Sequence, residues 1–127
     1  MKMRKNKNFT PFPSRAFIQD LLSCSDGAAL VRQHLSISPA TLIAGVLTIF
    51  TGLEAGLEHN CFEEAIPQEP TLDYLEEALR ILGLPDIAIT VKTDPLATLM
   101  NFRELAPSLD LQQLYQNARG MQLILAT

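Results

Sequence analysis

The residues best suited to chemistry gather where a long apolar segment gives way to acidic sequence. A histidine and a cysteine stand there among four carboxylates: Glu54, Glu58, His59, Cys61, Glu63 and Glu64. Such groups bind metal ions, and a histidine can act as a general base. The spacing matches no ExxH or HExxH pattern, and His59 lies off the helical face that Glu54 and Glu58 share. We therefore expect a solvated helix end, with an enzyme or metal site around His59 as an alternative.

Other catalytic and cofactor motifs are missing from the sequence. The two histidines, His34 and His59, lie in no nucleophile motif such as G-x-S-x-G. No G-x-G-x-x-G sequence and no P-loop is present, so nothing indicates a nucleotide. Cys24 and Cys61 form no CxxC pair, and we expect both to be reduced in a cytoplasmic protein, with a disulfide between them as the alternative. The sequence predicts no enzyme, no metal and no cofactor.

Charge is distributed unevenly along the chain. The net charge is −4, yet four basic residues stand together at the start: Lys2, Arg4, Lys5 and Lys7. No lysine or arginine lies between Arg32 and Arg80, a stretch that holds Glu54, Glu58, Glu63, Glu64, Glu69, Asp73, Glu76 and Glu77. This stretch disfavours nucleic acid, because phosphates are bound by cations. It suits another protein with a basic surface, which it would attract and orient.

One segment, Pro39–Leu53, is apolar throughout. Ser38 is a suitable N-cap and Pro39 fits the first helical position, so we predict a helix over about 39–57. Its apolar residues point in every direction, as in a helix that is buried centrally or crosses a membrane. Small residues recur at every fourth position and predict close packing against another helix at Ala44, Thr48, Gly52 and Gly56.

The same segment raises a membrane alternative. Residues 35–53 carry no charge, with basic residues upstream and acidic residues downstream, as in a single span with a cytoplasmic N-terminus. The uninterrupted apolar run is nevertheless shorter than a bilayer requires, and Ser36 and Ser38 precede it. We therefore predict a cytoplasmic protein, with a single-span membrane protein anchored by residues 35–53 as the alternative.

The first third of the chain divides into a tail and two short helices. Residues 1–13 are expected to form a flexible basic tail, because Pro11 and Pro13 oppose a helix. Residues 14–127 are expected to form a single helical domain. Its first two helices would begin at Ser14 and Asp26, each of which can serve as an N-cap.

The second half of the chain shows further helix signals. After a loop over 63–70, Thr71 is expected to cap a helix that Gly83 ends. Asp94-Pro95 starts another helix, with an apolar set of Leu96, Leu99, Met100 and Phe102. Ser108 or Asp110 caps a last helix over 111–119, which Gly120 would end.

The predicted fold class is mainly α, a compact bundle of five to six helices around the helix at 39–57. One exception is residues 87–91, where Ile87, Ile89 and Val91 alternate with less apolar residues as in a strand. Residues 121–125 fit either a strand or one more helical turn. A short two-stranded β element of 87–91 and 121–125 is therefore expected to pack on the helices.

These features favour a small acidic protein–protein interaction module, such as an adaptor, a chaperone or an inhibitor of a larger system. The sequence is 47% hydrophobic and 6% aromatic, a surplus of aliphatic residues that a partner or a homodimer could cover. The candidate contacts are leucine-rich helix faces flanked by acidic sequence: Leu72, Leu75, Glu76, Leu79, Leu82, Leu111, Leu114 and Tyr115. Core burial is the alternative role for these leucines.

Overall fold

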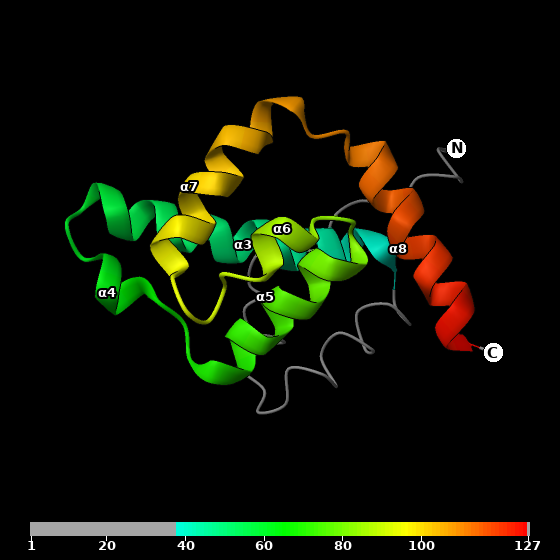
Figure 1. The fold of residues 1–127 in the computed structure, drawn as a ribbon, viewed down its shortest axis with the longest axis horizontal. Helices are drawn as coiled ribbons and strands as arrows, with labels where there is room; N and C mark the ends of the chain where they lie inside the picture. The colour runs from blue at the N-terminus through cyan, green and yellow to red at the C-terminus, as the bar shows by residue number, and fades with distance from the viewer. Residues whose placement is uncertain (1–37, 127) are drawn as a thin grey trace, which may run out of the picture.

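The described chain is helical. A computed structural model describes residues 38–126, with side chains up to Met121, and no strand occurs in that range. The elements, labelled as in Figure 1, are α3 (Pro39–Glu58), α4 (Phe62–Ala65), α5 (Glu69–Ile81), α6 (Pro85–Ala88), α7 (Pro95–Leu105), the 3₁₀-helix η1 (Ala106–Ser108) and α8 (Leu111–Ala126). The mainly α class predicted from the sequence is therefore confirmed. The expected tail at 1–13 and the helices expected at Ser14 and Asp26 lie outside the described residues.

The long helix α3 has a clear chemical start and stop. The Ser38 hydroxyl accepts a hydrogen bond from the Thr41 amide at 3.1 Å, and Pro39 occupies the first turn. At the other end Asn60 adopts a left-handed φ of 57°, and the Cys61 amide donates to the Gly56 carbonyl at 2.8 Å. These bonds form a Schellman ending, which satisfies carbonyls that the helix leaves open.

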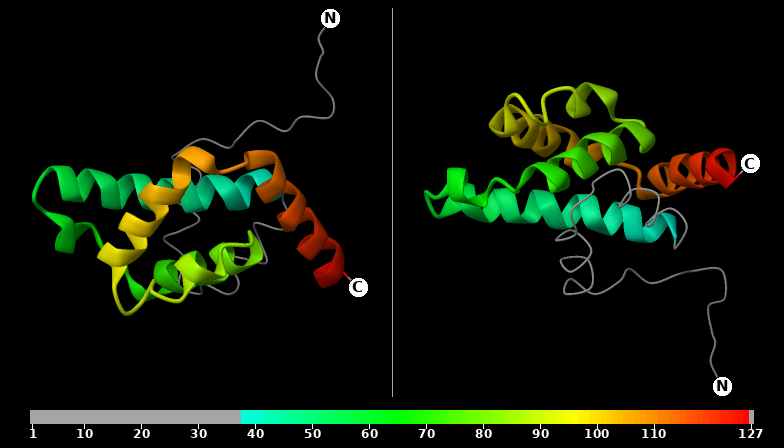
Figure 2. Two further views of the ribbon diagram at one scale, coloured as in Figure 1. Left: turned by 45° about the horizontal axis from the view of Figure 1, so that its top comes forward. Right: turned by 90° about the horizontal axis from the view of Figure 1, so that it is seen from below.

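Helices α4, α5, α7 and α8 contact α3. Helices α5, α6 and α7 lie on one side of it, while α8 crosses near its first turns (Figure 2). The rings of Phe50 and Phe102 stack with centroids 4.0 Å apart and join α3 to α7. The buried Tyr74 hydroxyl donates to the Leu42 carbonyl at 3.0 Å and joins α5 to α3. The apolar helix thus shares a buried cluster with α5 and α7.

The end of α5 is fixed by a second Schellman motif. Gly83 has a φ of +85°, and the Leu84 amide donates to the Leu79 carbonyl at 2.8 Å. The Asn117 side chain of α8 reaches over this turn and donates to the Leu82 carbonyl at 2.8 Å. A Cβ on residue 83 would lie 2.7 Å from that amide nitrogen, so this position requires glycine for both conformation and space.

The predicted β element is wrong. Residues 85–88 form α6, turns follow to 93, and residues 121–125 continue α8. Ile87, Ala88 and Val91 are buried, whereas Ile89 is 70% exposed. The alternation of branched residues coincides with an i, i+1, i+4 helical face, and Pro85 at the first position favours the helical choice.

Two helix boundaries also differ from prediction. Helix α5 begins at Glu69 rather than after Thr71, because Pro70 lies in the first turn, where its missing amide costs no hydrogen bond. Helix α8 passes through Gly120 to Ala126 instead of stopping. Gly120 has no positive φ, so it weakens the helix without ending it.

Candidate interaction surface

Most of the leucines proposed as partner contacts belong to the core. Leu75, Leu79, Leu82 and Leu114 are at most 6% exposed, and they pack in one cluster with α3. A partner cannot reach these side chains while the protein is folded. The other proposed contacts are Leu72 and Tyr115, which are half-buried, Glu76, which pairs with Arg80, and Leu111, which is 47% exposed.

Two exposed large apolar side chains lie together on α7. Leu96 is 43% exposed and Met100 is 36% exposed, and their i, i+4 spacing places them side by side. The sequence had assigned both to the apolar set of this helix together with Leu99 and Phe102. The structure buries Leu99 and Phe102 and gives the third inward position to Thr98.

Helix α7 is capped at its start and is joined to neighbouring segments by polar contacts. The Asp94 carboxylate caps the helix by accepting from the Ala97 amide at 3.1 Å. The Thr98 hydroxyl donates to the Asp94 carbonyl at 3.1 Å and lies 2.7 Å from the Thr90 hydroxyl. Arg103 pairs with Glu54 of α3 at 3.2 Å, beside the Phe50–Phe102 stack. We call the outward row of Leu96, Met100 and Glu104 the α7 surface.

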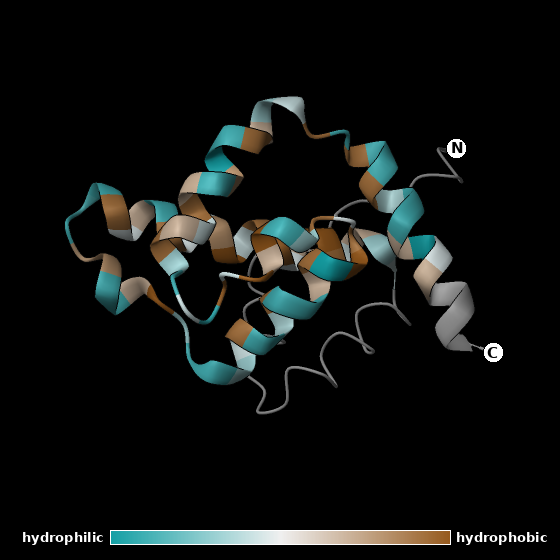
Figure 3. Cartoon of the chain, viewed as in Figure 1, coloured by the Kyte–Doolittle hydropathy of each residue, from teal (hydrophilic) through white to brown (hydrophobic). Residues whose placement is uncertain are grey.

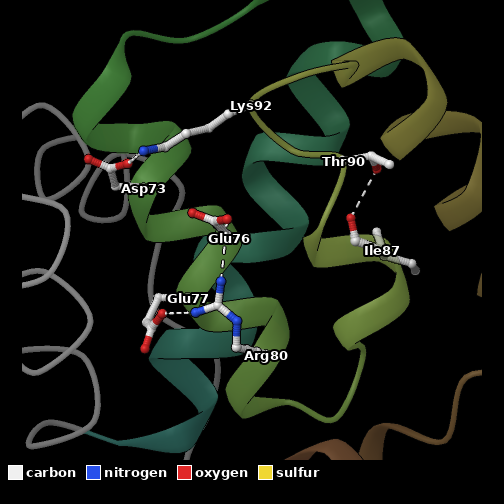
Figure 4. Close-up of polar contacts among 7 residues, drawn as sticks. All are labelled: Asp73, Glu76, Glu77, Arg80, Ile87, Thr90 and Lys92. Atoms are coloured by element: carbon white, nitrogen blue, oxygen red, sulfur yellow. Dashed lines mark hydrogen bonds and ion pairs between the residues drawn. The ribbon is translucent and has the colours of Figure 1, made fainter.

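The fold neutralises part of the acidic stretch. Lys92 pairs with Asp73, and Arg80 pairs with Glu76 and Glu77, all along the outward side of α5 (Figure 4). The hydrogen bond to Asp73 raises the pKa of Lys92. Hydrophilic residues accordingly dominate the viewed face of α5 (Figure 3). Because these cations follow the acidic stretch in the sequence, the fold reduces the net negative charge around that stretch.

Four carboxylates of the acidic stretch form no ion pair with a described residue. They occupy the end of α3, the whole of α4 and the start of α5: Glu58, Glu63, Glu64 and Glu69. Three of them stand in the first turn of α4 or α5, where the positive end of the helix dipole favours them. Helix stability thus explains the positions of Glu63, Glu64 and Glu69.

His59 and Cys61 lie at the same end of the molecule. His59 is the exposed C-cap residue of α3, and Cys61 is half-buried. No group of three histidine, cysteine, aspartate or glutamate residues within the described chain is close enough to hold a metal ion. His34 and Cys24 lie outside the described residues.

The four small residues of α3 meet different surroundings. Ala44 is buried and Thr48 is half-buried. A Cβ on Gly56 would collide with the Ala65 side chain of α4 and lie 3.2 Å from the Cys61 carbonyl oxygen, whereas a Cβ on Gly52 would have no neighbour within 4 Å. Close approach is therefore needed at Gly56, where the chain folds back on itself, and Gly52 faces open space.

Helix α3 is the one described helix that is long and apolar enough to cross a membrane, by length and composition alone. In its most apolar window 56% of the residues are buried inside the protein. A core helix of a soluble protein can pass the same test, so the property does not separate the two classes.

No protein-family model, no curated protein and no solved structure matches this chain. The functional proposal therefore rests on the surface of the chain itself.

Proposed function

We propose that this chain is a small cytoplasmic protein–protein interaction module, an adaptor, chaperone or inhibitor of a larger system, that docks through the α7 surface. The observation that carries the proposal is the exposure of Leu96 and Met100 next to each other on a helix that is capped by Asp94 and ion-paired to α3. Adjacent exposed apolar side chains on an ordered surface are typical of binding sites.

The inward faces of the other described helices support this choice of surface. Leucines of α5 and α8 that could have bound a partner are committed to the core around α3. The remaining large exposed apolar residues, Ile89 and Leu111, lie on other segments as single positions. Isolated apolar residues are normal on protein surfaces, whereas a pair on one helix face offers two anchors to a partner.

Site-specific photocrosslinking in native cells tests the proposal. A photoreactive amino acid at position 96 or 100 should yield a defined crosslinked product with one partner protein. The control is Gln112, an exposed position of α8 outside the α7 surface. The same product from position 112, or no product from positions 96 and 100, would count against the α7 surface as a docking site.

A compact helical domain over 14–127 is part of the proposal. All eight residues from Pro39 to Val46 are buried, as expected if helices surround this part of α3. A homodimer through the α7 surface is a related possibility, in which the crosslinked partner would be a second copy. Mass analysis of the crosslinked product distinguishes a second copy from a different protein.

The membrane alternative is kept as a second candidate because α3 passes the length and composition test. It would require residues 35–53 to face lipid. The hydrogen bond from Tyr74 to the Leu42 carbonyl supports a core position for this helix instead. Carbonate extraction of native membranes separates the candidates: release into the soluble fraction eliminates the span, and retention in the pellet supports it.

A further inference from the structure

We infer that the partner of the α7 surface presents a basic amphipathic helix, with two apolar side chains one turn apart and lysine or arginine beside them. This inference rests on the proposed function and adds the chemistry of the partner. It follows from the order of apolar and charged groups along α7 and from the absence of any described cation paired with its end carboxylates.

The α7 surface is a row of three side chains on successive turns. Leu96, Met100 and Glu104 are spaced by four residues, so each lies next to the following one on the helix. Asp94 precedes the row as the N-cap residue and is exposed. The two apolar anchors therefore have a carboxylate at each end.

No cation pairs with these carboxylates within the described chain. Twelve acidic and four basic residues lie within 38–126. Arg103, the cation on α7 itself, is paired with Glu54, and Arg80 and Lys92 are paired along α5. The fourth, Arg119, is exposed on α8 and forms no ion pair with a described residue. Asp94 and Glu104 have no ion pair with a described residue. The border of the apolar pair is thus negative, which favours a cationic partner and repels an anionic one.

The size of the surface sets the expected strength of the complex. A stable interface buries about 800 Å² on each partner, more than two half-exposed side chains provide. Charge attraction would then contribute mainly to association rate and selectivity, and salt would screen it over roughly 10 Å at 0.1 M. We expect a weak, reversible complex whose affinity falls as salt is added.

Two designed peptides test the chemistry on the full chain. The first is an amphipathic helix of leucine and lysine, and the second keeps the leucines but replaces every lysine with glutamate. Fluorescence anisotropy should show about tenfold tighter binding of the lysine peptide, equivalent to 1.4 kcal/mol. Equal binding of the two peptides, or tighter binding of the glutamate peptide, overturns the inference.

A pair of matched variants tests the location. Glu104→Lys should weaken binding of the lysine peptide several-fold, whereas Glu64→Lys makes the same charge change on α4 and should have a smaller effect. Leu96→Gln and Met100→Gln keep helix-forming side chains but remove the apolar anchors, and each should weaken binding. Circular dichroism checks that the variants fold. Equal losses for Glu104→Lys and Glu64→Lys would indicate attraction by net charge alone and would overturn the inference.

Failure of this inference can be told apart from failure of the proposed function. A crosslink from position 96 to an acidic or uncharged partner segment keeps the docking surface and refutes the basic partner. Absence of any crosslink from α7 refutes the docking surface itself, whatever the peptides do.

Discussion

The first eight and the last twelve residues of α3, which we call its first and second halves, differ in their surroundings. All residues of the first half, Pro39–Val46, are buried. In the second half, Leu47–Glu58, an outward face of small side chains that includes Thr51, Gly52 and Ala55 is exposed. The sequence alone suggests one helix that is apolar on every side. In the fold, the first half of α3 is buried on all sides, and the second half has one buried face and one exposed face.

This difference separates the core interpretation of α3 from the membrane interpretation. A membrane span exposes its apolar sides to lipid along the whole apolar length. A core helix can let one face reach water wherever its neighbours leave it uncovered, provided that the face carries small or polar groups. A charged substitution in the second half should therefore be tolerated if α3 is a core helix and should be disruptive if α3 spans a membrane.

The largest expected effect comes from one charge placed in either half. Ala44→Lys buries an ammonium group in the first half, at a cost of several kcal/mol that is comparable with the stability of a small domain. Ala55→Lys places the same group in water and should change the free energy of unfolding by no more than about 0.5 kcal/mol. Urea denaturation followed by circular dichroism measures both variants.

Two outcomes would contradict this pair of predictions. Tolerance of Ala44→Lys would mean that the first half of α3 is not enclosed. Loss of folding on Ala55→Lys would mean that the outward face of the second half is covered by lipid or by a partner.

A smaller effect distinguishes two glycines within the second half. Gly56→Ala should destabilise the protein by about 1–3 kcal/mol, because the new methyl group meets Ala65 and the nearby Cys61 carbonyl. Ala65→Gly in the same chain should recover part of that loss by removing the colliding carbon. Gly52→Ala meets no atom within 4 Å and should stabilise the helix by roughly 0.5–1 kcal/mol. Similar unfolding curves for Gly52→Ala and Gly56→Ala would refute the assigned close approach.

Helix starts and stops could be predicted because they depend on adjacent residues. Ser38 and Asp94 each bond to an amide three residues ahead, and Gly83 adopts the left-handed conformation that a terminating glycine supplies. These are local chemical events that the sequence contains in full. The strand prediction for residues 87–91 failed because Ile87 and Val91 fit both the strand and the helix periodicity. Only tertiary packing chooses between the two.

The candidate surface could be predicted less well because exposure is decided by distant residues. Leu96 and Leu99 are both leucines of one helix, and nothing local shows that Leu99 packs in the core while Leu96 stays outside. Glu54 likewise meets Arg103 only after folding brings α7 onto α3. Assigning Thr98 to the inward face would have predicted that Leu96 and Met100 face outward. Threonine is a poor indicator of burial, because it is usually exposed.

The smallest expected effect concerns the first half of α3 and depends on pH. Burial raises the pKa of the Tyr74 phenol well above its ordinary value of about 10. Tyr74→Phe removes the bond to the Leu42 carbonyl and should cost about 1 kcal/mol at neutral pH. As pH rises above the ordinary pKa, the unfolded tyrosine ionises while the folded one keeps its proton. The wild-type chain therefore loses up to about 1.4 kcal/mol per pH unit from this residue, and the phenylalanine variant does not. Urea denaturation above pH 10 should show the advantage of the wild-type chain over the phenylalanine variant shrinking as pH rises. Parallel curves would show that the phenol is not enclosed beside the first half of α3.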